Sequence, residues 1–306
     1  MSGQPIYIIA PQYNFERAAT PLQIRSFKYY IENLTFPEVQ TTYDRFDEKI
    51  AAIRENLTKH FMQKLNVDVS QRIIPRTRIH IMDEDSFNKL RDELGYSNDT
   101  RAMYSNKYLH IYIKINDATG KARKESSMLR TLCHELVHSI SYNLVHFTDN
   151  NTYIVIKSGF KEKDDEYFLF NEVVTDLCVL QEIKNYWTSD TRLAPFAKDA
   201  FFEVPYYRAV IILDAIMEYV CNKSSISYQG ILELLQNDYI LGTKDSLKLI
   251  KSHLGIAKFE FLKNLGDSKT NKLDIYETGK ALGLDAFLEE WLKSENGKRY
   301  QFCKHL

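Results

Sequence analysis

Two histidines and a glutamate stand close together in the run Cys133-His134-Glu135-Leu136-Val137-His138, at the spacing that a zinc-dependent hydrolase requires. On a helix, residues four apart project from the same face, so the rings of His134 and His138 can bind one metal ion. Glu135 lies about 100° further round the helix, where it can act on a metal-bound water but is badly placed as a third ligand. The run therefore predicts a metal site, provided that it is helical. The alternative is a pair of histidines packed in the core.

The residues before this run predict the helix that it needs. Ser126 or Ser127 can cap the helix, because a serine hydroxyl accepts hydrogen bonds from the first backbone amides. Apolar residues then recur at helical spacing and indicate a buried stripe, namely Leu129, Leu132, Leu136 and Ile140. Cys133 adjoins a proposed ligand but points about 100° away from it, so we expect a core residue and not a redox centre.

A second polar run, Asn171-Glu172-Val173-Val174-Thr175-Asp176, lies in another helical pattern. Glu172 follows His138 by 34 positions, which is enough chain for a loop or hairpin and a return to the metal. Two histidines and one glutamate are a standard ligand set for catalytic zinc, which keeps a fourth position open for water. Asp176, one turn later, can accept the free ring N–H of a ligating histidine. The two acids can instead form a solvated face, although a buried acidic pair needs a partner such as a cation.

The two runs together resemble the gluzincin metallopeptidases, the thermolysin-like group, whose second motif reads Asn-Glu-x-x-Ser/Thr-Asp. The resemblance covers about residues 78 to 185. Compact bacterial gluzincins are the most similar, because an alternating segment at residues 108–115 precedes the first run and Lys157-Ser158-Gly159-Phe160 precedes the second. Metzincins fit poorly, since they need a glycine and a third histidine where this chain has Ser141 and Leu144.

The resemblance implies one zinc ion per chain, bound by His134, His138 and Glu172. It also implies that Glu135 is the general base and that Asp176 orients a ligating histidine, more plausibly His134. The expected reaction is hydrolysis of a peptide bond in a peptide or protein substrate.

A hydrogen-bond donor must also stabilise the oxyanion that develops during such a reaction. Gluzincins usually take this donor, a histidine or a tyrosine, from the later helical part of the chain. Pro205-Tyr206-Tyr207-Arg208 stands there, at the start of a predicted helix, so Tyr207 and after it Tyr206 are the candidates. In a chain with 20 tyrosines, a packed aromatic pair is the alternative interpretation.

Two other functions are compatible with the same zinc ligands. The chain can be a catalytically inactive zinc-binding module with a regulatory or interaction role, or a toxin-like effector protease with a single protein target. An activity that disappears in Glu135→Gln distinguishes an enzyme from a binding module, and one dominant cleavage in a lysate identifies an effector.

The periodicity of apolar residues predicts an α+β fold, in which a small mixed sheet and the motif helix precede a mainly helical lower subdomain. We expect an N-terminal helical region at 1–70, a gluzincin-like catalytic core at 71–222 and a C-terminal helical region at 223–306. Residues 20–67 read mainly as helix, interrupted at Pro37.

Further elements follow from the same patterns. Residues 76–82 alternate as a strand, and residues 84–95 form a helix that ends near Gly95. Residues 108–115 alternate as a strand with His110 at the sheet surface, or facing the cleft as the alternative. In gluzincins the strand near the zinc commonly pairs with an extended substrate, so by analogy part of this region is expected to form the upper rim of the cleft. A β-hairpin is predicted from residues 153–157 and 167–170, and helices from residues 206–221, 228–239, 245–263 and 273–293.

Composition excludes other classes of protein. The 40 basic and 41 acidic residues nearly balance, with a net charge of −1, so nucleic acid is not an expected partner. No apolar segment of about 18 residues is present, which argues against a transmembrane helix and a membrane partner. The N-terminus lacks the features of a signal peptide, so we expect a cytoplasmic protein, or one secreted by a signal-independent route. No oligomeric state is predicted. Four scattered cysteines indicate free thiols, namely Cys133, Cys178, Cys221 and Cys303.

Overall fold

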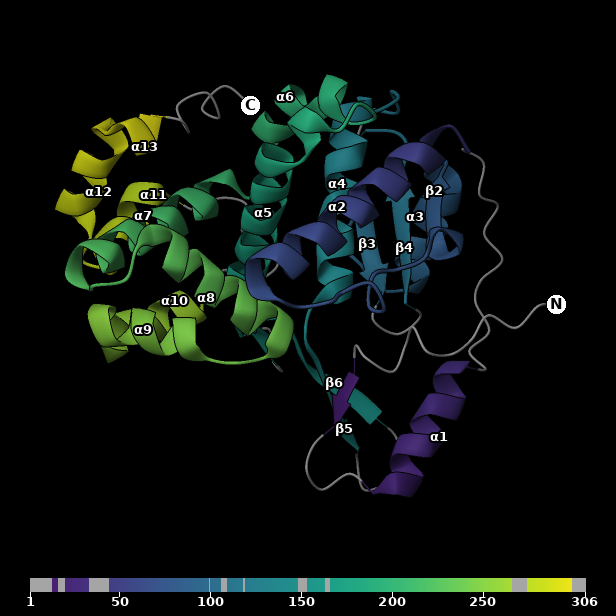
Figure 1. The fold of residues 1–306 in the computed structure, drawn as a ribbon, viewed down its shortest axis with the longest axis horizontal. Coiled ribbons are helices and arrows are strands. Elements are labelled where there is room, and N and C mark those ends of the chain that lie inside the picture. Colours follow the sequence, from purple (N-terminus) through teal and green to yellow (C-terminus); the bar gives the residue numbers. More distant parts are fainter. Residues whose placement is uncertain are drawn as a thin grey trace. The chain divides into compact units, whose positions relative to one another are not determined.

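The computed structural model describes residues 13–15, 20–32, 44–98, 100–105, 109–117, 119–147, 153–162, 166–265 and 274–298. These residues form mainly helices with two small sheets, which confirms the predicted α+β class (Figure 1). None of the described helices is long and apolar enough to cross a membrane. The chain divides into two compact units: one comprises Met1–Ile140, Leu144–Ile154 and Val179–Phe201, and the other Ser141–Asn143, Val155–Cys178 and Phe202–Leu306. The three regions predicted from the sequence stay a prediction.

The first unit contains a three-stranded mixed sheet with the strand order β2-β4-β3. β2 (Ile79–Met82) runs parallel to β4 (His110–Lys114), whereas β3 (Ala102–Ser105) pairs antiparallel with β4. α3 (Glu84–Glu93) packs on β4, and a buried apolar cluster joins residues of α3 to residues of all three strands: Met82, Phe87, Leu90, Met103 and Tyr112. α4 (Glu125–Ile140) packs against β3 and β4, and α2 (Asp47–Leu65) packs against α4 (Figure 1).

The strand predicted at 108–115 is confirmed over His110–Lys114, but two expectations about it are wrong. β4 has β2 on one side and β3 on the other, so it has no open edge to which an extended substrate can add. His110 is also buried, with 6% of its surface exposed, and its Nδ1 lies 2.7 Å from Nε2 of His80. Burial lowers the pKa of His80 to about 4 and that of His110 to about 3, so both rings are neutral at pH 7.

The other predicted elements of this unit are largely confirmed. α1 (Pro21–Glu32) and α2 account for the N-terminal helical pattern, and Pro37 lies outside the described residues. Residues 76–82 form a strand only from Ile79, because Arg76–Arg78 are a 3₁₀ turn. α3 ends two residues before Gly95, whose φ is +76°. α6 (Ala194–Phe202) was not predicted.

The predicted β-hairpin is only half correct. β6 (Tyr153–Ser158) pairs antiparallel with β7 (Lys161–Glu162), whereas the proposed second strand at 167–170 lies at the start of α5 (Phe168–Asn185). A short apolar run is compatible with either state, and here it continues without a break into a helical pattern. β1 (Tyr13–Phe15), β5 (Asn143–Phe147), β6 and β7 form the second sheet, in this order.

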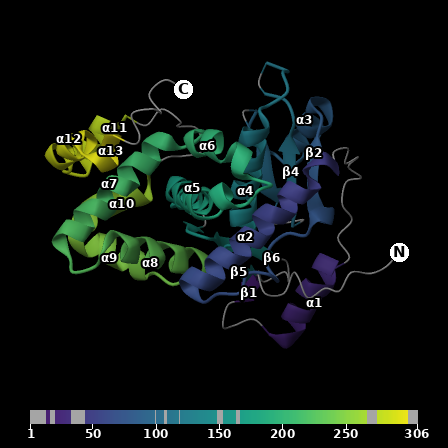
Figure 2. The ribbon, with the colours of Figure 1, turned by 45° about the horizontal axis from the view of Figure 1, so that its top comes forward.

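The second unit is mainly helical, and α7 (Tyr207–Lys223) packs against α8, α9, α11 and α12 (Figure 2). The helices predicted at 206–221 and 228–239 correspond to α7 and α8 (Tyr228–Leu241). The pattern at 245–263 is two helices, since Gly255 adopts a φ of +84° between α9 (Asp245–Leu254) and α10 (Ile256–Lys263). The pattern at 273–293 is likewise divided, and the last helices are α11 (Ile275–Ala281), α12 (Asp285–Lys293) and α13 (Glu295–Lys298).

Candidate metal centre

The first polar run lies on α4, as the metal-site prediction requires. The predicted apolar stripe is buried along this helix, and it consists of Leu129, Leu132, Leu136 and Ile140. Its burial fixes the rotation of the helix about its own axis and therefore the direction in which the two histidines point. The predicted cap is wrong, because α4 starts at Glu125 and both Ser126 and Ser127 lie inside its first turn. Cys133 is fully buried, as expected of a core residue.

The two imidazoles of α4 converge. Nε2 of His138 lies 3.0 Å from Nε2 of His134, and the ring centroids are 4.6 Å apart with an interplanar angle of 76°. His134 is buried and His138 is half-buried. Two nitrogen ligands of tetrahedral zinc, each at about 2.05 Å, are about 3.3 Å apart. The histidine nitrogens therefore already have nearly the separation that one zinc ion needs.

Glu172, in the second turn of α5, offers a third potential ligand atom. One atom from each of His134, His138 and Glu172 can be chosen so that the three lie within 4.8 Å of one another. No other cluster of three His, Cys, Asp or Glu ligands with this spacing occurs in the described part of the chain. Two imidazole nitrogens and one carboxylate oxygen are the donor chemistry of a catalytic zinc site, so the residues present fit the metal that the resemblance implies.

Glu135, the predicted general base, has only 8% of its surface exposed. Its negative charge acts on Tyr96, a residue that the sequence did not single out. Burial and, as the smaller cause, the negative charge of Glu135 together raise the pKa of Tyr96 to about 12. The Tyr96 hydroxyl donates to the backbone oxygen of Tyr104 in β3, at 3.4 Å, while 40% of the residue's surface remains exposed. Tyr96 follows α3 after a short turn, where no spacing rule connects it to Glu135, 39 residues later.

Asp176, the predicted orienting residue, is fully buried and lies one turn beyond Glu172 on α5. A carboxyl group buried in this way needs hydrogen-bond donors or a proton. Its role as acceptor for a ligating histidine stays a prediction.

The two tyrosines predicted as oxyanion donors lie at the start of α7, and neither belongs to the group of three ligands. Tyr206 precedes the helix and Tyr207 is its first residue, and both are half-buried. The Tyr207 hydroxyl accepts a hydrogen bond of 2.9 Å from Nε of Arg208, whose guanidinium also lies 5.6 Å from the Tyr207 ring centroid. The hydroxyl of Tyr207 is thus held by its neighbour, and the catalytic role of both tyrosines stays a prediction.

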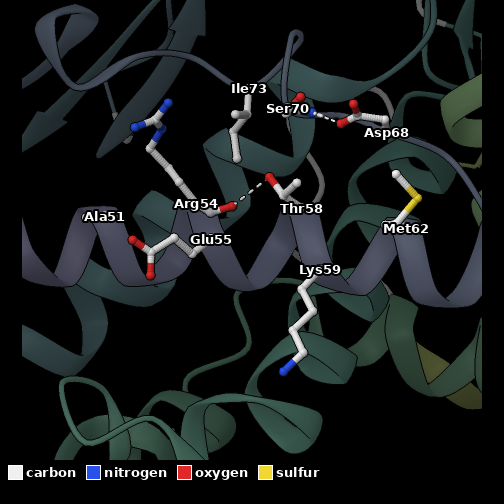
Figure 3. Close-up of a pocket in the computed structure, with 9 residues that line it drawn as sticks. All are labelled: Ala51, Arg54, Glu55, Thr58, Lys59, Met62, Asp68, Ser70 and Ile73. Carbon is white, nitrogen blue, oxygen red and sulfur yellow. Dashed lines mark hydrogen bonds between the residues drawn. The ribbon is translucent and has the colours of Figure 1, made fainter.

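An open groove of about 610 Å³ lies along α2, and none of the predicted site residues lines it (Figure 3). Arg54 rises from α2 toward Ile73, whereas Lys59 points away from the 68–73 segment (Figure 3). The acid Glu55 is paired with Arg192 at 2.8 Å, and Asp68 accepts from the backbone N–H of Ser70. The groove carries charges of both signs, and the ligand set of the metal centre has no counterpart in it.

Comparison of the whole chain with protein-family models, with curated proteins and with solved structures gave no match.

Proposed function

We propose that this protein is a zinc-dependent metallopeptidase of the gluzincin type. One observation supports the proposal above the others: His134, His138 and Glu172 offer ligand atoms within 4.8 Å of one another, although 34 positions separate the last two. A histidine pair that served only the core would not need a carboxylate beside it. The finding was anticipated from the two runs of sequence, which makes a chance encounter of three polar side chains a poor explanation.

The proposed chemistry assigns one role to each residue. His134, His138 and Glu172 hold the zinc ion, which when bound polarises the scissile carbonyl and acidifies a water molecule. Glu135 accepts a proton from the attacking water and then donates it to the leaving amine. With 8% exposure, Glu135 is shielded from bulk solvent, which favours its retention of the proton between these two steps.

The sheet also limits where an extended peptide substrate can bind. Backbone hydrogen bonds can be added only at a free edge of a sheet, and β4 has none. Of the two edge strands, β3 packs against α4, the helix that carries Glu135. We therefore assign the substrate to β3, in place of the strand at 108–115 that the sequence suggested.

The test compares the wild type with Glu135→Gln at matched zinc content, on a mixed peptide library read by mass spectrometry. Glutamine is nearly isosteric and leaves the three ligands in place, so the variant should stay folded and keep its zinc. Peptide hydrolysis should fall by at least the ~10²–10⁴ that general-base catalysis contributes. Glu125→Gln is the matched control, because it makes the same change on the same helix, at a residue that pairs with Lys49 at 2.6 Å.

Three results would redirect the proposal. Equal hydrolysis by the wild type and Glu135→Gln would exclude Glu135 as the general base, and zinc binding with no cleavage of any peptide would identify a zinc-binding module without peptidase activity. A single dominant cleavage in a lysate, absent in Glu135→Gln, would retain the chemistry and specify an effector protease.

A further inference from the structure

The turn of α5 that carries Glu172 is held from its N-terminal side by Asn171. The Asn171 side-chain oxygen accepts a hydrogen bond of 2.8 Å from the backbone N–H of Phe160, in the turn between β6 and β7. Asn171 is buried, with 4% of its surface exposed. The residue immediately before the proposed ligand is therefore fixed by a bond to a different element of the chain.

Gly159 makes this approach possible. Its φ is +58°, and a Cβ at this position would lie 2.4 Å from the Asn171 side-chain oxygen and 2.6 Å from the ring of Tyr239. Any other residue would force these groups apart. The β6–β7 turn is thus pressed against both Asn171 and Tyr239.

Thr175 holds the same turn of α5 from the other side of Glu172. Its hydroxyl donates to the backbone oxygen of Asn171 at 2.9 Å and lies 2.8 Å from the hydroxyl of Tyr239 in α8. Either hydroxyl can be the donor in the second bond, since each carries one proton and can also accept. Thr175 and Tyr239 are both fully buried, so water cannot replace either partner without a rearrangement.

Electrostatics favour the neutral form of the Tyr239 hydroxyl. Burial raises the pKa of Tyr239 well above its ordinary value, and the negative charge of Glu172 adds to the rise. The influence of Glu172 also means that the phenol lies close enough to sense the charge of the ligand carboxylate.

From this arrangement we infer that Tyr239 is a positioning residue of the metal centre, which acts through Thr175 to fix the helical turn that presents Glu172. The inference rests on the proposed metal site and extends it to the C-terminal helices. Zinc ligands must be placed within a few tenths of an ångström, and anchors at residues 171 and 175 bracket Glu172 on one turn of helix. According to this inference, α8 contributes to metal binding by positioning the turn that carries Glu172.

The experiment measures zinc affinity by competition with a chelating dye, and the absorption spectrum of the Co²⁺-loaded protein. Tyr239→Phe should weaken zinc binding about 10-fold, at the lower end of the 10–100-fold that loss of an outer-shell partner costs, and should alter the Co²⁺ spectrum. Tyr228→Phe is the matched control, since it removes a hydroxyl from the same helix that bonds to Asp214. This control should leave both measurements unchanged.

Thr175 provides a second, independent test. Thr175→Ser retains the bridging hydroxyl and should bind zinc as the wild type does, whereas Thr175→Val should reproduce the loss seen in Tyr239→Phe. A purely structural role predicts a different result, in which Tyr239→Phe lowers the midpoint of thermal unfolding while zinc affinity and the Co²⁺ spectrum stay unchanged. If the wild type binds zinc and the variant gives that result, the inference about Tyr239 is wrong and the proposed function stands. If the wild type binds no zinc, both the inference and the proposed function are wrong.

Discussion

Two glutamates of α5, ten residues apart, have carboxyl groups in different environments. Glu172 is half-buried, and a carboxylate oxygen of Glu172 lies within 4.8 Å of nitrogens of His134 and His138. Glu182 is fully buried, and neither of its carboxyl oxygens has a hydrogen-bond partner in the described residues. Burial raises the pKa of Glu182 well above its ordinary value, and the negative charge of Asp190 adds to the rise.

The difference shows that burial alone does not identify a binding site. A buried carboxyl group can remain charged if a cation compensates it, or it can keep its proton and become neutral. The prediction that buried acids beside apolar residues need a cation covers only the first solution. The raised pKa of Glu182 favours the second solution, so what distinguishes Glu172 is the convergence of His134 and His138 upon it.

The sharpest test of this contrast is the same substitution at both positions. Glu172→Gln should lose its zinc, from about one ion per chain to nearly none at a free zinc concentration that saturates the wild type, because a neutral amide is a far poorer ligand than a carboxylate. Glu182→Gln should keep its zinc. Elemental analysis of dialysed protein measures both, and equal zinc contents in the two variants would contradict the ligand assignment.

A smaller effect is expected at Asp176, which is buried one turn beyond Glu172. Asp176→Asn should preserve the fold but weaken zinc affinity or activity by about 10–100-fold, because an amide orients a ligating histidine less strongly than a carboxylate does. Zinc affinity and peptide hydrolysis are measured on the folded variant, with circular dichroism to check the helices. A fully active variant would show that Asp176, like Glu182, is a buried acid without a role at the metal.

The same contrast explains which parts of the site were predictable. His134, Glu135 and His138 lie within one run of helix, so local geometry fixes which of them share a face. Glu172 lies 34 positions after His138, so it was predicted from the usual ligand set of catalytic zinc and from the resemblance of its motif to a family, not from local geometry. Tyr96 and Tyr239 come from distant elements with no characteristic spacing, and their proximity to Glu135 and Glu172 depends on tertiary packing. No pattern in one sequence reports such contacts.

The fold was predictable to a similar extent and for similar reasons. Long amphipathic helices such as α7 and α8 follow from periodicity alone. The errors fall where tertiary context decides, as at residues 167–170, where a short apolar run joined a helix instead of a strand. His110 alternates like a surface residue, yet it is buried against His80 because β4 became the centre of its sheet and not the edge.

The pH dependence of the stability of the fold tests the protonated state of Glu182. Because its pKa is higher in the folded protein than the ordinary 4.5, the folded state holds a proton that the unfolded chain releases as the pH rises. The stabilisation from this proton is complete below pH 4.5 and is lost as the pH rises toward the folded-state pKa, at about 1.4 kcal/mol per pH unit. Asp190 is not expected to cancel this pH dependence, because its carboxylate is already paired with Arg192 at 2.8 Å.

Glu182→Gln removes this proton linkage. Its free energy of unfolding should therefore rise relative to the wild type by about 1.4 kcal/mol for each pH unit above 4.5, up to the folded-state pKa. Urea unfolding of both proteins at pH 5, 6 and 7, in the presence of a chelator, excludes any contribution from bound metal. Glu93→Gln, at an exposed position in α3, is the control and should show no such trend. If the difference in the free energy of unfolding between Glu182→Gln and the wild type does not change with pH, Glu182 is ionised in the folded protein. The contrast with Glu172 then fails, because both glutamates would carry a compensated charge.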